Sequence, residues 1–285
     1  MNEIKRVLIH IRWPLQSFTL LGFLFSVVVC NVNFSVHLVL GFISWFLLCA
    51  GIAVFNSYYD KDVNPVAGLK NPPTVTFSML VGAWLLKLSG LIIAIFLFNK
   101  TFLLVYILGI IISVLYSHEK FRFKSNGYVA VFTNFIIGVI TFIAAYSFSS
   151  ANTAVLFLGS LTAGTFLSAI CLMMQVHQKE EDKTRKDISI MVSHGRKMTI
   201  AVAIFLMTIA AILAIFTFIL SSLSWLYVLI VVIYFSIILF ISYFWLKKQE
   251  DSASDFIIMN KLTMRLSYAG NLILIIIYVL DIIKK

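Results

Sequence analysis

Three polar segments of the chain carry residue types that bind metals or anions. In the first, Asn56, Asp60 and Asn64 follow one another at intervals of four residues. On a continuous helix this spacing places them within a sector of about 80°. Oxygen donors on one face suit Mg²⁺, which takes few protein ligands and shares others with water and substrate phosphates. Asp62 points elsewhere on a regular helix, and it joins this set only if the helix unwinds before Pro65.

The second segment has a similar face. Gln175, Gln178 and Asp182 are separated by three and four residues, which places them within a sector of about 60° on a helix. Glu180 and Glu181 fall outside that sector. Asp182 is therefore the acid expected to hold a metal, with Gln175 and Gln178 as weaker oxygen donors.

The third segment is basic. Lys120, Arg122 and Lys124 alternate with aromatic residues and follow Tyr116. Such cations neutralise a diphosphate, and an arginine also offers it a bidentate fork. Each segment taken alone has a plainer explanation: the first caps a helix end, and the other two are solvated loops with topogenic charge.

The composition decides where these segments must lie. The chain of 285 residues is 61% hydrophobic and 12% charged, with a mean hydropathy of +1.01. A soluble domain is about a quarter charged, so this chain has too little polar surface for water. We expect an all-α integral membrane protein. The net charge of +10 is explained by topology, and no nucleic-acid partner is expected.

Apolar runs long enough to cross a membrane need roughly 20 residues. Nine such runs are expected, in one transmembrane domain covering 1–285. They are 14–30, 35–57, 76–98, 102–117, 127–147, 154–176, 198–220, 225–246 and 266–283.

Basic residues alternate between the connections. They gather before the first run and in the loops after the second, fourth, sixth and eighth, whereas the other connections hold only Lys100. The positive-inside rule therefore places the N-terminus and the polar loops at about 58–75, 117–126 and 177–197 in the cytoplasm. We expect a multi-pass protein of a bacterial inner membrane, with all three polar segments on its cytoplasmic face.

Taken together, these residues resemble the UbiA superfamily of intramembrane prenyltransferases. The first family motif, N-x-x-x-D-x-x-x-D, reads here Asn56, Asp60 and Asn64. The family's middle loop, Y-S-x-x-x-x-R-x-K-x-x-G, is matched at Tyr116, Ser117, Arg122, Lys124 and Gly127, and Lys120 completes Y-x-x-x-K. The second acidic motif, D-x-x-D-x-x-x-D, reads Gln175, Gln178 and Asp182, and Arg12-Trp13-Pro14 looks like the start of the family's first helix.

The resemblance implies a nine-helix UbiA-like bundle that transfers a polyprenyl group, with Mg²⁺, from a prenyl diphosphate to an aromatic or lipid-like acceptor within the membrane lipid. The roles it implies are as follows: Asp60, Lys120 and Arg122 catalytic; Asn56, Tyr59, Lys70, Tyr116 and Lys124 substrate-binding; Asp60, Asp62, Asn64, Gln178 and Asp182 metal-binding. The chain departs from the family at Asn64, Gln175 and Gln178, where amides replace acids, so one metal ion rather than two is a possible outcome.

Two other functions stay open. An intramembrane terpene cyclase has the same fold, and only its product distinguishes it. A transporter or lipid-binding protein without chemistry is the other, and Lys87, within an apolar run, is the residue that favours it. An alternative for Lys87 is a lysine that snorkels to the membrane interface.

Overall fold

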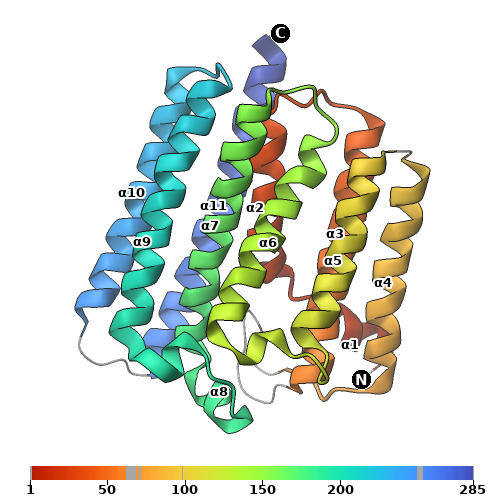
Figure 1. Cartoon of the computed structure of the whole chain (residues 1–285), viewed down its shortest axis with the longest axis vertical. Helices are drawn as coiled ribbons and strands as arrows, with labels where there is room; N and C mark the ends of the chain where they lie inside the picture. The colour runs from red at the N-terminus through yellow and green to blue at the C-terminus, as the bar shows by residue number, and fades with distance from the viewer. Residues whose placement is uncertain (1, 62–68, 70–71, 98, 249–252, 285) are drawn as a thin grey trace.

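The computed structural model describes residues 2–61, 69, 72–97, 99–248 and 253–284 and is a bundle of long helices (Figure 1). The elements in chain order are α1 (Glu3–His10), α2 (Trp13–Val29), α3 (Val36–Asp60), α4 (Phe77–Phe96), α5 (Lys100–Ser117), the short 3₁₀ helix η1 (Phe123–Ser125), α6 (Gly127–Tyr146), α7 (Thr153–His177), α8 (Lys179–Arg185), α9 (Ile190–Leu220), α10 (Trp225–Lys247) and α11 (Ala253–Lys284).

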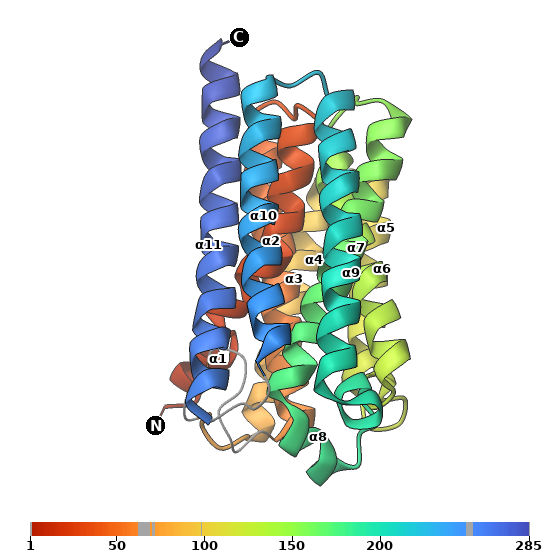
Figure 2. The same cartoon turned by 90° about the vertical axis from the view of Figure 1, so that its left-hand side faces the viewer.

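Eight helices in the described part of the chain are long and apolar enough to cross a membrane: α3 to α7 and α9 to α11. The helices α1 and α2 meet at a bend of 48° and form a ninth span if they are counted together. The expected all-α, multi-span architecture is thus confirmed. The N-terminus and the C-terminus lie at opposite ends of the bundle (Figures 1 and 2), as an odd number of spans requires.

Polar caps begin several spans. The side chains of Ser35, Asn99 and Asn126 accept hydrogen bonds from backbone N–H groups in the first turns of α3, α5 and α6. Each cap satisfies a donor that has no partner within the helix. The helix ends are therefore set by single polar residues between apolar runs.

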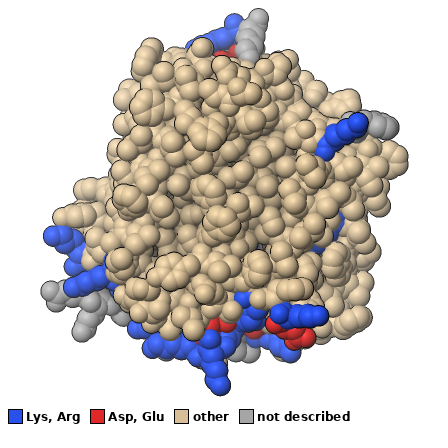
Figure 3. All heavy atoms as spheres, in the orientation of Figure 1, with Lys and Arg blue, Asp and Glu red and all other residues tan. Residues whose placement is uncertain are grey.

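Charged side chains gather at one end of the molecule. The lower end in Figure 3, where α1 and α8 lie, carries most of the visible Lys, Arg, Asp and Glu atoms, whereas the apolar sides are almost free of them. This end brings together the end of α3 and the connections after α5 and α7. The three polar segments therefore share one face, which we call the charged end.

Both expected ligand-bearing helices break at their polar segments. The helix α3 ends at Asp60 because Lys61 takes a left-handed conformation with φ 51°, so the helical face that carries Asn56 ends at Asp60. The helix α7 ends at His177, and Gln178 separates it from α8. Asp182 consequently lies on a different helix from Gln175.

Lys87 does not snorkel to an interface. Its side chain is buried in the bundle, where Nζ donates to Ser113 Oγ at 2.8 Å and lies 3.8 Å from the centre of the Phe55 ring. A Cβ on Gly51 would lie 2.7 Å from Lys87 Cγ, so the glycine makes room for the lysine. This buried cation is satisfied by an aromatic face and a hydroxyl.

Close approach of α6 and α7 depends on Gly138. A Cβ there would lie 2.3 Å from the carbonyl oxygen of Ala163 and 2.7 Å from Cα of Gly164. Backbone cannot move aside as a side chain does, so Gly138→Ala is expected to lower the thermal unfolding midpoint in detergent, with a destabilisation of about 2 kcal/mol. Gly22→Ala is the control, because its new Cβ would meet side-chain atoms alone, a methyl of Thr141 at 3.3 Å and the Cβ of Ala163 at 3.9 Å. Equal midpoints for the two variants would contradict this account.

Candidate active site

Asn56, Asp60 and Lys124 form the centre of the charged end. Asn56 and Asp60 lie one turn apart at the end of α3, and Asn56 Nδ2 donates to Asp60 Oδ2 at 2.9 Å. The ammonium of Lys124, on η1, donates to Asn56 Oδ1 at 2.7 Å and also to Asp60 Oδ1. Ser117 Oγ, at the end of α5, donates to Asn56 Oδ1 at 2.9 Å. Residues from α3, α5 and η1 thus meet in one hydrogen-bonded cluster.

Burial governs the charges of this cluster. Only 7% of the Asp60 side chain and 9% of the Lys124 side chain are exposed. Burial lowers the pKa of Lys124, and the neighbouring Asp60 carboxylate opposes that effect. A buried charge is tolerated only with a partner and hydrogen bonds, so each of these two side chains stabilises the charge of the other.

Two arginines complete the surroundings of Asp60. Arg185 Nη1, at the end of α8, lies 3.6 Å from Asp60 Oδ1, and Arg122 Nη2 lies 3.9 Å from it. Arg122 also forms a bidentate pair with Asp187, in which Nε donates to Oδ1 at 3.1 Å and Nη2 donates to Oδ2 at 3.0 Å. The hydrogen bonds to Asp187 raise the pKa of Arg122. Fixed cations therefore surround this carboxylate.

The second acidic segment faces the same place. Asp182 is buried on α8. Burial raises the pKa of Asp182 to about 6, and the negative charges of Asp187 and Asp60 add to this shift, whereas the Ser189 hydroxyl near the carboxylate acts to lower the pKa. Gln175 has a structural contact, since its Oε1 accepts the backbone N–H of Ile190 at 2.9 Å. It thereby ties the end of α7 to the start of α9.

A single cavity of about 230 Å³ joins these groups to the membrane interior. Its polar mouth is lined by Arg12, Asn56, Asp60, Lys124, Gln175, Gln178, Asp182, Arg185, Asp187 and Ser189. Behind them the walls are mostly apolar and include Phe18, Trp45, Leu48, Ile52 and Leu167. The cavity is therefore charged at one end and apolar in its depth.

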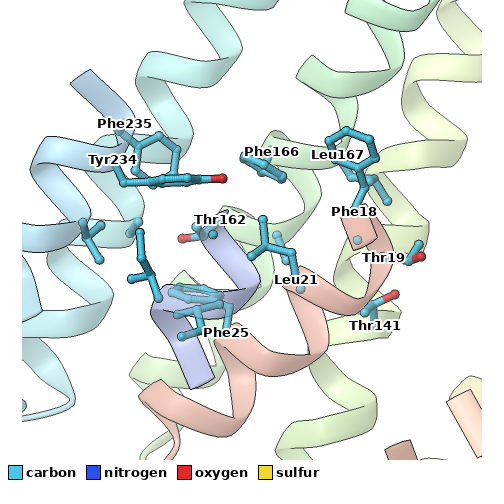
Figure 4. A pocket seen from close by; sticks show the side chains of 18 of the residues that line it. Phe18, Thr19, Leu21, Phe25, Thr141, Thr162, Phe166, Leu167, Tyr234 and Phe235 are labelled. Carbon is cyan, nitrogen blue, oxygen red and sulfur yellow. The ribbon is translucent and has the colours of Figure 1, made fainter. Parts of the chain in front are cut away.

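An apolar pocket of about 70 Å³ adjoins this cavity (Figure 4). The two share Phe18, Thr19, Thr141 and Leu167 as walls. In Figure 4, Phe25, Phe166 and Phe235 surround the space from different helices. A long hydrocarbon chain that starts at the mouth has apolar surroundings along this direction.

Comparison with known proteins identifies the family. A family model described as the UbiA prenyltransferase family matches residues 16–267. The chain belongs to the UbiA prenyltransferase family. This confirms the resemblance seen in the motifs and the enzyme class that it implied, an intramembrane prenyltransferase. No curated protein matches the sequence.

Solved structures share the UbiA fold. A UbiA homolog from Archaeoglobus fulgidus bound to DMAPP and Mg²⁺ is 22% identical, with a TM-score of 0.68 over 93% of this chain and 99% of the other. The apo UbiA homolog from Aeropyrum pernix K1 is 17% identical, with a TM-score of 0.70 over 94% and 98%. A structure of digeranylgeranylglyceryl phosphate synthase is 19% identical, with a TM-score of 0.66 over 98% and 99%.

The site residues expected from sequence are partly brought together. Asn56, Asp60, Tyr116, Lys124, Gln178 and Asp182 line the cavity, and Arg122 lies beside it. Tyr59 packs on Phe55 and His118, with ring centres 4.9 and 5.0 Å apart. Lys120 is exposed, and neither it nor Tyr59 contributes to the cavity wall. Asp62, Asn64 and Lys70 lie outside the described residues, so their roles stay predictions.

Three residues near the mouth carry roles that the motif spacing did not assign. Arg12 is buried at the bend between α1 and α2, in a left-handed conformation with φ 54°, and lines the cavity. Arg185 and Asp187 belong to a mixed-charge stretch that looked like a solvated loop. The signal available in the sequence was the proximity of this stretch to Asp182, and the pairing with Arg122 required the tertiary structure.

The buried carboxylate of Asp182 is expected to cost stability. Its pKa in the native state, about 6, exceeds the unfolded value of about 3.9. Stability should therefore fall as the pH rises from about 4 to about 6, because the native state binds the extra proton there, and the penalty remains above pH 6. Asp182→Asn should stabilise the metal-free protein at pH 7 by about 1–2 kcal/mol in the free energy of unfolding, and so raise its thermal midpoint. At pH 4 the midpoint should not rise.

The control for this experiment is Glu119→Gln, which changes an exposed carboxylate on the neighbouring loop. It should leave the midpoint unchanged at both pH values. A lower midpoint for Asp182→Asn at pH 7 would show that favourable interactions of the carboxylate outweigh the cost of its burial.

Proposed function

We propose that this protein transfers a polyprenyl group from a prenyl diphosphate to an aromatic or lipid-like acceptor inside the membrane, with Mg²⁺. The observation that carries the proposal is the cavity that joins a charged mouth, holding Asp60 and Asp182, to an apolar depth. A prenyl diphosphate has the same division, with an anionic head on a hydrocarbon tail. The Archaeoglobus homolog with DMAPP and Mg²⁺ supports this choice of substrate.

The donor set at the mouth fits a magnesium ion. Asn56, Asp60, Gln178 and Asp182 offer carboxylate and amide oxygens, the ligands that Mg²⁺ takes. No cluster of three or more acidic, histidine or cysteine ligands occurs among the described residues, which suits an ion that shares its ligands with a diphosphate. We propose these four as ligands, with Asp62 and Asn64 as further candidates. A bound Mg²⁺ supplies positive charge to the diphosphate as its bond to carbon breaks.

The chain's own cations would neutralise the rest of the negative charge on the departing diphosphate. Arg12, Lys124 and Arg185 line the mouth, with Arg122 beside them, and fixed cations in a buried site stabilise a departing anion without reorganising. Lys70 and Lys120 are proposed to assist from the loops. Breaking the C–O bond leaves an allylic cation, which the apolar walls and the Tyr116 ring shield from water.

The apolar pocket beyond the cavity would hold the isoprenoid tail. It lies between helices rather than in a loop, so the tail stays in apolar surroundings while the head reaches the mouth. Tyr59 is proposed to support the α3 end through its contact with Phe55 rather than to touch the tail. We propose that the charged end faces the cytoplasm of a bacterial inner membrane, as the distribution of basic residues suggests.

Diphosphate release tests the proposal directly. The detergent-purified protein is given geranylgeranyl diphosphate and Mg²⁺, with and without an extract of membrane lipids and quinone precursors. Asp60→Asn and Asp182→Asn should each reduce Mg²⁺-dependent release by at least about 100-fold, because each removes a charge that binds the metal diphosphate. Asp281→Asn, on the distant end of α11, is the control and should retain activity.

The outcomes separate the alternatives. Release that depends on the extract indicates a transferase, and release without it, yielding a cyclised hydrocarbon, indicates a cyclase. If folded protein releases no diphosphate from substrates of several chain lengths, the enzyme proposal is rejected in favour of binding or transport.

Lys124 is expected to affect metal and diphosphate in opposite directions. In the described structure its ammonium holds Asn56 Oδ1 and Asp60 Oδ1, the oxygens proposed for Mg²⁺. Lys124→Met should therefore tighten binding of Mn²⁺ alone several-fold, and should weaken binding of the prenyl diphosphate with metal by about 10-fold. Paramagnetic resonance of Mn²⁺ measures the first and calorimetry the second. The control is Lys197→Met, an exposed lysine on α9; weaker Mn²⁺ binding by the Lys124 variant would oppose the shared-oxygen model.

A further inference from the structure

The loops that follow α5 and α8 are joined by their backbones. Ile188 N donates to Ser125 O at 2.7 Å, and Gly127 N donates to Ile188 O at 2.8 Å. Asn126 and Ile188 thereby form a short parallel bridge, although some 60 positions separate them in the sequence. A Cβ on Gly127 would lie 2.4 Å from Ile190 N, so the absence of a side chain permits this contact. The two loops are thus fixed to each other beside the mouth.

Asp187 lies immediately before this bridge. Its side chain is 7% exposed and holds the Nε and Nη2 edge of Arg122 at 3.1 and 3.0 Å. Its backbone N–H donates to the carbonyl oxygen of Asp182 at 2.8 Å. The backbone that carries this carboxylate is therefore held on both sides, by the bridge at Ile188 and by the end of α8. A bidentate pair of this kind restricts the plane of the guanidinium as well as its position.

Arg122 lies beside the cavity rather than in its wall, and the edge that Asp187 leaves open is close to Asp60, which is a wall residue. Asp187 occupies Nε and one direction of Nη2, while Nη2 also lies 3.9 Å from Asp60 Oδ1. Among the described residues, no acceptor engages Nη1. An anion that arrives beside Asp60 can accept from the Nη1 and Nη2 edge without displacing Asp187.

We propose that Asp187 is a positioning residue, which holds Arg122 with its Nη1 and Nη2 edge ready for the diphosphate. This inference rests on the proposed prenyl diphosphate function. The carboxylate borders the mouth of the cavity, and we assign its effect to its pairing with Arg122. Its contribution is to pre-orient a flexible side chain, which otherwise loses rotamer freedom on binding the substrate.

The test uses Asp187→Asn and Asp187→Glu in the full-length protein. Asp187→Asn keeps the shape but loses the charge that fixes the guanidinium. It should raise the KM for geranylgeranyl diphosphate about 10-fold while kcat changes less than about 2-fold, because ground-state binding is affected. The dissociation constant of inorganic diphosphate with Mg²⁺, measured by calorimetry without turnover, should rise by a similar factor. Asp187→Glu should restore part of both.

Matched variants separate positioning from folding. Glu119→Gln removes an exposed acid of the same loop region and should leave KM and diphosphate affinity unchanged. In an Arg122→Gln background, Asp187→Asn should cause no further loss of diphosphate affinity, since its effect passes through Arg122. If both Asp187 variants fold poorly, diphosphate affinity alone is measured on the folded, detergent-solubilised fraction. The comparison is again between Asp187→Asn in the wild-type and in the Arg122→Gln background.

Several results would overturn the inference. An unchanged or tighter diphosphate affinity for Asp187→Asn would show that the carboxylate is neutral or competes with the substrate for Arg122. A loss of kcat at constant KM would assign it to the chemical step. A wild-type protein that neither binds nor cleaves prenyl diphosphates would reject the proposed function, and this inference with it, whereas an active wild type with indifferent Asp187 variants rejects only this inference.

Discussion

A carboxylate buried where a membrane helix ends sets the organisation of the charged end. Asp60 is almost fully enclosed, and leaving its charge unpaired there would cost several kcal/mol. Lys124, Arg122 and Arg185 approach it from η1, the loop before η1 and α8. Because those cations come from segments distant in the sequence, satisfying Asp60 requires the connections after α5 and α7 to fold over the end of α3. The polar mouth is thus a product of charge pairing as much as of helix packing.

The division of the cavity follows from the same constraint. Charges can be paired only near the loops, where several segments with Lys, Arg, Asp and Gln meet. Deeper in the bundle, the exception among the charged residues described is Lys87. It lies behind the cavity wall against Phe55 and Trp84, and its Nζ donates to Ser113, which is part of that wall. The depth therefore stays apolar, which is what an allylic cation and an isoprenoid tail need if water is to be excluded. The position of Lys87 gives no continuous polar path across the membrane, which weakens the transport alternative.

The sequence predicted the spans and the centre of the site for different reasons. Each span is an apolar run of sufficient length, and lipid makes hydropathy decisive. Asn56, Asp60 and Lys124 could be predicted as site residues because their spacing and types matched a mechanism and a family. The helix ends were less predictable, since Lys61 and Gln178 end helices through backbone conformations that any of several residues can take. Arg185 and Asp187 were missed because charged neighbours on both sides make a solvated loop the simpler interpretation.

The amides that replace family acids are explained by different contacts. The side-chain carbonyl oxygen of Gln175 accepts the backbone N–H of Ile190 and so joins α7 to α9. An acid in place of Gln175 would add negative charge near Asp182. Gln178 lies at the break between α7 and α8, where its side chain faces the cavity without adding charge. Asp187 meanwhile contributes a carboxylate that the motifs do not include, and Arg122 neutralises it. Among the described residues, the negative charge around the mouth is therefore redistributed: Asp60 ends α3, whereas Asp182 and Asp187 lie on and just after α8. Such a site depends on its loops being fixed to one another, and the backbone bridge between Asn126 and Ile188 supplies that connection.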